Sequence, residues 1–150
     1  MQISKNFYLK EFTDSNTAAR NGIDNTPGQT EIMNLQRLTR KVLQPLRDMI
    51  GVSIHISSGY RCKELNKLVK GANKSQHMFG EAADIQVFAK DLREVYLLIK
   101  DKIPEYDQLI YEFGQWIHVS LRVQNNRKEN LVFEKIDGKN IRRDFIEGEF

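Results

Sequence analysis

The segment SSGYRCKELNKLVKGANKSQHMFGEAAD, residues 57–84, carries the residues around which the fold is expected to form. It is polar and interrupted by glycines, and it runs into Ala82–Val87 (AADIQV), which is typical of a strand. It contains an arginine, a histidine and an aspartate, which are side chains common at metal and catalytic sites. A later segment, YEFGQWIHVS at residues 111–120, adds a second histidine and a glutamate. The sequence therefore predicts one site shared by the two segments.

Three side chains are candidate ligands of one divalent ion. His77 and Asp84 are separated by Gly80, which favours a loop folding back onto a strand over a single helix. His118 belongs to a second predicted strand and can supply the third donor. Catalytic zinc takes three protein ligands of this kind and keeps a fourth position for water. Two imidazoles and one carboxylate thus predict a Zn²⁺ site.

Composition limits the alternatives. The chain has 150 residues, 40% hydrophobic and 29% charged, as expected for a single folded domain spanning 1–150. The net charge of +3 and pI near 9.0 are mild, and no basic run is dense enough to predict nucleic-acid binding. The one cysteine, Cys62, excludes an internal disulfide, and it is interpreted as a packed thiol although it follows Arg61.

The pattern of apolar residues predicts an α+β fold, with helices against a small, mostly antiparallel sheet. A long helix should follow Thr26 as N-cap and Pro27 as first residue, and Pro45 should kink it or begin a new turn. Residues 3–12 are expected to pack onto the core as an arm. Further elements are predicted at 52–57 (strand), 64–69 (helix), 82–87 (strand), 92–103 (helix), 108–112 and 116–121 (strands), with a hairpin at 131–145 around Asp137-Gly138.

The segment SQHMFGEAAD resembles the Ser-x-His-x-x-Gly-x-Ala-x-Asp motif of the M15-type zinc peptidases, matched at Ser75, His77, Gly80, Ala82 and Asp84. These enzymes include D-Ala-D-Ala carboxypeptidases and L-alanyl-D-glutamate endolysins, and they share a fold with the hedgehog signalling domain. SGYR (58–61) resembles the family's arginine segment, and WIHVS (116–120) resembles the segment of the last ligand histidine. The first part of the chain resembles the phage and prophage branch. The resemblance covers residues 3–122, with a motif-bearing core at 26–122.

The sequence departs from that family at the general base. The best-known members have an acidic residue three positions before the last histidine, and here that position is Gln115. Glu112 is the expected substitute, provided that the turn after it holds an odd number of residues and so keeps it on the face of His118. The alternative is that Glu112 is an exposed residue at a hairpin end. Asp107 is a weaker candidate.

The resemblance implies roles for further residues. Arg61 would orient the substrate and stabilise the oxyanion, unless it is only a surface ion-pair partner. Ser75 would bind substrate or shape the loop, and Trp116 would line the pocket or pack in the core. His55 is interpreted as a structural or exposed residue. The implied function is hydrolysis of peptidoglycan stem peptides. The alternatives are a non-catalytic zinc-containing binding module and a metal-free phage structural protein.

Expectations about partners and location follow from the same reading. The partner is a peptidoglycan peptide, and neither nucleic acid nor a membrane is expected to bind. The N-terminal MQISKNFYLKEF lacks the apolar stretch of a signal peptide, which predicts synthesis in the cytoplasm and action at the cell wall after release, or on a virion. A monomer is expected.

Overall fold

The computed structural model describes residues 1–150 and has the predicted α+β class. Its helical segments are α1 (Leu9–Thr13), α2 (Asn16–Arg20), α3 (Gln29–Leu38), η1 (Thr39–Leu43), α4 (Gln44–Ile50), α5 (Lys63–Leu68), η2 (Gln76–Phe79) and α6 (Leu92–Lys102). Its strands are β1 (Gln2–Ser4), β2 (Phe7–Tyr8), β3 (His55–Ser58), β4 (Ala82–Gln86), β5 (Gln108–Glu112), β6 (Trp116–Ser120), β7 (Glu129–Ile136) and β8 (Lys139–Asp144). None of the helices is long and apolar enough to cross a membrane.

Six strands form the main sheet, in the order β3-β4-β6-β5-β7-β8. Every neighbouring pair is antiparallel except β5 and β7, so the sheet is mixed, and mostly antiparallel as predicted. The connection after β6 crosses β5 to reach β7, which is why that pair is parallel. Strands β1 and β2 form a separate small antiparallel pair near the N-terminus.

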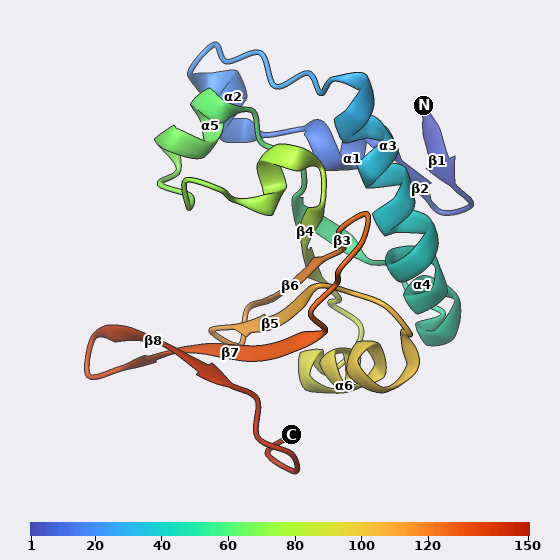
Figure 1. The fold of residues 1–150 in the computed structure, drawn as a ribbon, viewed down its shortest axis with the longest axis vertical. Helices are drawn as coiled ribbons and strands as arrows, with labels where there is room; N and C mark the ends of the chain where they lie inside the picture. The colour runs from blue at the N-terminus through green and yellow to red at the C-terminus, as the bar shows by residue number, and fades with distance from the viewer.

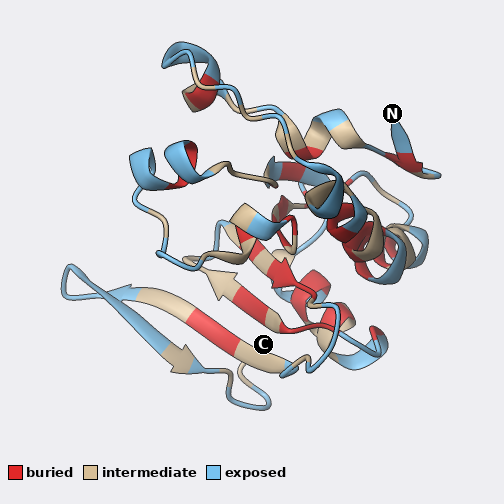
Figure 2. Cartoon of the chain, turned by 45° about the horizontal axis from the view of Figure 1, so that its top comes forward, coloured by how far each residue is buried: buried red, intermediate tan, exposed pale blue.

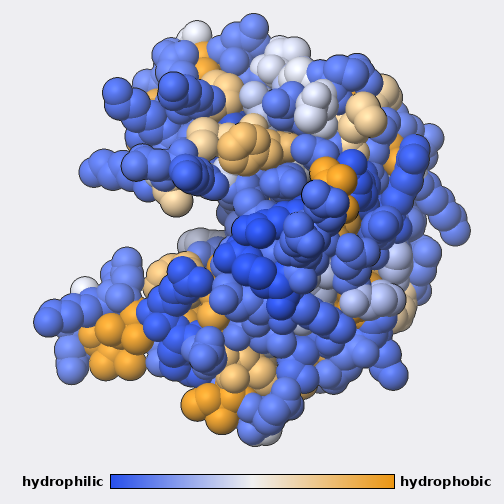
Figure 3. Space-filling model, viewed as in Figure 1, coloured by the Kyte–Doolittle hydropathy of each residue, from blue (hydrophilic) through white to orange (hydrophobic).

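One face of the sheet carries the hydrophobic core. Apolar residues alternate with polar ones along β4 and β6, so that Ile85, Ile117 and Val119 point to the same side and are fully buried. They join a cluster of 23 buried residues with the helices α3, α4 and α6, which cover this face (Figures 1 and 2). On the opposite face of the sheet lie η2 and α5. Between these helices and the β7–β8 hairpin the surface has a deep hollow (Figure 3).

The long predicted helix is interrupted. Its start was predicted two residues too early, because Asp24 accepts hydrogen bonds from both the backbone N–H and the hydroxyl of Thr26 and holds it in a turn. Gly28 is the N-cap instead. Further along, Pro45 is the second residue of α4, as the prediction of a new turn allows. The π-helical turn η1 precedes α4, and the Gln44 N–H donates to the Thr39 carbonyl five residues back. This wider turn accommodates Pro45, which has no backbone N–H to donate.

Three helical segments were not predicted, and the first of them is α1 in the N-terminal arm. The segment around His77 and Gly80 was expected to be a loop, but residues 76–79 form the 3-10 helix η2. The polar segment 15–25 contains α2, whose N-cap Ser15 accepts a hydrogen bond from Ala18 N–H. The N-terminal arm packs on the core as expected, with Phe7 and Phe12 almost completely buried.

Candidate metal centre

His77 is held in place from behind by a backbone carbonyl. The side chain lies on η2 and is only 2% exposed. Its Nδ1 lies 2.6 Å from the Gly59 carbonyl oxygen, which can only accept, so the proton is on Nδ1 and Nε2 is free to bind a metal. Nε2 points toward Asp84, with a distance of 3.4 Å to Oδ1. The short helix therefore presents one imidazole nitrogen over the sheet.

Asp84 and His118 lie opposite each other on neighbouring strands. They are register partners in the antiparallel β4–β6 pair, so their side chains share the face that is not covered by α6. His118 Nδ1 is 2.9 Å from Asp84 Oδ1. The carboxylate oxygen thus faces one nitrogen of each histidine, and the structure brings together all three predicted ligands.

The donor set fits a zinc ion. One donor atom from each of His77, Asp84 and His118 lies within 4.8 Å of the others. Tetrahedral zinc with bonds of about 2.0–2.2 Å holds its donors roughly 3.3 Å apart, close to the distances found here. Two neutral imidazoles and one carboxylate are also the donor chemistry of catalytic zinc sites.

Burial and proximity shift the pKa values of these groups. Burial lowers the pKa of the His77 imidazole, which favours the neutral ring that a metal requires. Burial alone would raise the pKa of Asp84, but His77 and His118 outweigh it and hold that pKa well below its usual range. Burial also opposes charge on His118, yet the hydrogen bond and charge of Asp84 raise its pKa. The carboxylate is therefore ionised and available as a ligand.

Glu112 lies on the face of the candidate ligands. The turn after it holds residues 113–115, an odd number, and Glu112 is the register partner of Trp116 while Ile110 is that of His118. The Trp116 indole N–H donates to Glu112 Oε2 at 2.5 Å. Burial raises the pKa of Glu112, and the negative charge of Asp84 raises it further. A carboxylate with a raised pKa beside this group is a stronger base than an ordinary glutamate, which suits it to accepting a proton.

Arg61 lies beside η2, the helical turn that carries His77. Its backbone N–H donates to the His77 carbonyl at 3.1 Å, and its side-chain Nη2 donates to the Ser75 hydroxyl at 3.2 Å. Its Nε is buried without a hydrogen-bond partner. Burial lowers the pKa of this guanidinium, while the charges of Asp84 and Glu112 partly compensate. Arg61 is thus no surface ion-pair partner, and an unsatisfied buried donor is placed beside the candidate ligands.

The remaining candidates lie elsewhere. Gln115 is exposed in the β5–β6 turn. Asp107 was the weaker candidate for the base. Its carboxylate instead forms ion pairs with Arg122 and Arg127, which lie in the loop after β6. The Cys62 thiol caps α5, accepting from Leu65 N–H at 3.4 Å. His55 is exposed and contacts the Phe88 ring.

Sequence reasoning missed the role of Gly59. Its carbonyl orients His77, and its Cα packs so tightly on α1 that an added Cβ would lie 2.5 Å from the Phe12 carbonyl oxygen. The sequence held one signal for this role. Gly59 directly precedes Tyr60 and Arg61 in the segment that resembles the family's arginine segment.

Comparisons with known proteins agree with this geometry. A search of curated proteins finds no match to the chain. The family model of Peptidase M15 matches residues 5–120, which include all three candidate ligands as well as Arg61 and Glu112. The matched part ends at the last residue of β6, before the β7–β8 hairpin. The chain belongs to the Peptidase M15 family.

Proposed function

We propose that the chain is a zinc-dependent peptidase that hydrolyses peptidoglycan stem peptides, with His77, Asp84 and His118 as the metal ligands. The observation that carries the proposal is that the three donor atoms converge on the sheet face that also bears Glu112. The family match supports peptide hydrolysis. The resemblance of the SQHMFGEAAD motif to enzymes that act on D-amino-acid bonds supports peptidoglycan as the substrate.

Each residue has a distinct part in this mechanism. When bound, zinc supplies Lewis-acid catalysis and lowers the pKa of water toward neutrality. Glu112 accepts the proton of the attacking water and then delivers it to the leaving amine. Its raised pKa suits both steps, because it makes the carboxylate a stronger base and keeps the acquired proton available for transfer. The Trp116 N–H fixes the orientation of the carboxylate.

The substrate is positioned by the residues on the other side of the cleft. Arg61 donates to the substrate carbonyl as negative charge develops on its oxygen, or pairs with a substrate carboxylate. Ser75 holds the Arg61 guanidinium and faces the same space. Trp116 lines the cleft beside the base. We expect a monomeric enzyme that acts at the cell wall, without a nucleic-acid or membrane partner.

Substituting the proposed base tests the mechanism. Glu112→Gln should retain stoichiometric zinc and lose about 10³-fold in turnover, since general base catalysis contributes about 10²–10⁴-fold. Metal content after dialysis and the release of amines from purified peptidoglycan are the two measurements. Gln115→Ala is the matched control and should hydrolyse as wild type, although it alters the position that is acidic in the best-known members. Equal turnover by Glu112→Gln and wild type would refute the assignment.

The exposed Gln115 also favours a second candidate function, a non-catalytic zinc-containing binding module of the same fold. In that case the wild-type protein would hold zinc and bind peptidoglycan peptides, but would release no amines from them. Mass spectra of the digested muropeptides would also identify the bond cleaved, and whether the enzyme is a carboxypeptidase or an endopeptidase of the phage type.

A further inference from the structure

The β7–β8 hairpin extends the face that carries the candidate ligands. It follows the part of the chain matched by the family model, and β7 pairs with β5 so that two more strands continue the sheet beyond the site. The hairpin forms the lower wall of the hollow seen in the space-filling view, opposite α5 (Figures 1 and 3). Side chains on the upper face of this hairpin therefore border the cleft.

The strand register identifies those side chains. Glu112 is the partner of Trp116 on β6 and of Phe133 on β7, and Phe133 is the partner of Arg142 on β8. Register partners point to the same face of a sheet, so these four side chains form one row on the face of His118. Strands lie about 4.8 Å apart, which places the Arg142 Cα roughly 10 Å from that of Glu112.

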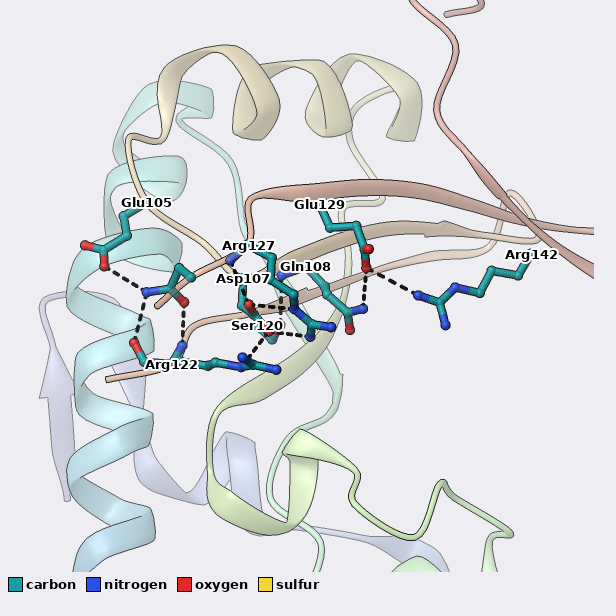
Figure 4. Close-up of polar contacts among 9 residues, drawn as sticks. Glu105, Asp107, Gln108, Ser120, Arg122, Arg127, Glu129 and Arg142 are labelled. Carbon is teal, nitrogen blue, oxygen red and sulfur yellow. Dashed lines mark hydrogen bonds and ion pairs between the residues drawn. The ribbon is translucent and has the colours of Figure 1, made fainter. Parts of the chain in front are cut away.

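Arg142 is incompletely paired at the outer end of this row. Its side chain is 58% exposed, and its one hydrogen bond joins Nη2 to Glu129 Oε1 at 3.3 Å (Figure 4). Glu129 is itself engaged by the Gln108 amide at 2.7 Å. A guanidinium has five N–H donors, so most of those of Arg142 are free for a ligand.

The neighbouring arginine is bound very differently. Arg143 points to the other face of the hairpin, where Glu134 and Glu149 accept hydrogen bonds from its Nε, Nη1 and Nη2. Those contacts hold the C-terminal segment against β7 and β8. Arg142, on the cleft side of the hairpin, is therefore the arginine with N–H donors free to bind a ligand.

The row between the base and Arg142 is apolar. Phe133 is half-buried there, and its carbonyl accepts a hydrogen bond from Phe113 N–H at 2.9 Å. The Phe113 ring contacts Trp116, with 5.9 Å between ring centroids, although its backbone has a φ of +57°, which is unfavourable for a bulky residue. Aromatic surface thus flanks Glu112 and continues toward Arg142, which suits the packing of an extended peptide.

The opposite wall favours an anionic ligand. Residues 61–74 include Arg61 and four exposed lysines at positions 63, 67, 70 and 74, against the single acidic residue Glu64. Exposed positive charge on this segment raises the local concentration of anionic substrates near the cleft.

We propose that Arg142 and Phe133 form an outer subsite that binds a carboxylate-bearing part of the peptide substrate. The separation of roughly 10 Å between the Glu112 and Arg142 Cα atoms corresponds to about three residues of extended peptide, since each spans about 3.3–3.6 Å. The Arg142 guanidinium pairs with the substrate carboxylate through two parallel N–H donors, and Phe133 packs against the intervening residues. This inference rests on the proposed function, because the ligand is the peptide cleaved at the metal centre.

Binding measurements separate this subsite from catalysis. The probe is a soluble muropeptide with free carboxylates and its amidated counterpart, titrated calorimetrically into zinc-loaded Glu112→Gln protein. Adding Arg142→Ala should weaken binding of the free-carboxylate peptide about tenfold and leave the amidated peptide unchanged. In the otherwise wild-type enzyme, Arg142→Ala should raise KM for the first peptide with little change in kcat.

Lys139→Ala is the matched control, because it removes a positive charge from the same hairpin on the face away from the cleft. It should bind and hydrolyse both peptides as its parent does. The subsite proposal would be overturned if Arg142→Ala weakened the binding of both peptides equally, or weakened the binding of neither. Arg142-dependent binding without any hydrolysis by wild type would instead uphold the subsite and refute the peptidase proposal.

Discussion

At the scale of single residues, Gly59 makes a testable link between packing and metal binding. An added Cβ would lie 2.5 Å and 2.6 Å from the Phe12 carbonyl oxygen and Cα, which are backbone atoms that cannot move aside. Gly59→Ala must therefore shift the backbone carbonyl that orients His77. We expect about 2 kcal/mol lower stability from overpacking, and about 10–100-fold weaker zinc binding from loss of the orienting bond.

Gly28→Ala is the control for this substitution. A Cβ at Gly28 would meet mainly the flexible carboxylate of Glu31, and the residue is remote in sequence from the ligands. Zinc affinity measured by competition with a chelating dye should then match that of wild type. Unchanged zinc affinity in Gly59→Ala would show that the carbonyl does not orient His77.

The convergence of the candidate site residues could be predicted because it follows from their spacing in the sequence. His77, Asp84 and His118 fit a motif, and the three-residue turn places Glu112 on the face of His118 by strand alternation, as predicted. Gly59 could not be predicted in this way. Its role depends on a backbone carbonyl and on close contact with Phe12, 47 positions earlier in the chain, and neither leaves a local pattern.

At the scale of elements, the connection between β6 and β7 is held by a buried carboxylate. Asp107 is fully buried and accepts hydrogen bonds from the Arg127 N–H and guanidinium, while Arg122 Nε lies 3.1 Å away (Figure 4). Breaking a fully buried pair costs about 3–5 kcal/mol. Because the two arginines are 40% and 42% exposed, we expect Asp107→Asn to cost about 2 kcal/mol instead.

The same residue predicts a pH dependence. Burial alone would raise the pKa of Asp107, but the hydrogen bonds and charge of Arg127, with the charge of Arg122, lower it below that of the unfolded chain. Its stabilising contribution is then complete above about pH 4 and is lost as the pH falls toward the folded pKa. Urea unfolding between pH 2 and 7 should show a shallower acid decline in Asp107→Asn. Asp14→Asn, which removes only an exposed pair with Lys10, should behave as wild type.

Elements with strong periodicity were predicted, whereas those set by tertiary contacts were not. The helix 92–103 and the strands around the 113–115 turn lie close to their predicted positions. In contrast, η2 has no apolar period of its own. It ends at Gly80, whose φ of +71° and contact with the Glu31 carbonyl make it a docking point for α3. The start of α3 was likewise decided by Asp24 and Thr26, which compete with the predicted cap.

At the scale of the whole molecule, the proposed ion joins two parts of the fold. His77 comes from η2 above the cleft, whereas Asp84 and His118 come from the sheet below it. A ligand that binds only the folded state stabilises it by about 4 kcal/mol at a thousandfold excess over its Kd. For a chain of this length, that corresponds to a rise in Tm of about 10 °C. Removing zinc should therefore lower Tm by this amount and free η2 from the sheet.

Calorimetry with and without a chelator measures the first effect, and hydrogen exchange of the amides in residues 75–80 measures the second. His77→Ala should melt at the same temperature with or without zinc, because it removes the one ligand that comes from η2. His55→Ala, which lies outside the cluster, should keep the full zinc-dependent rise. If zinc raised the Tm of His77→Ala as much as that of wild type, the ion would bind elsewhere and the two parts of the cleft would not be joined through it.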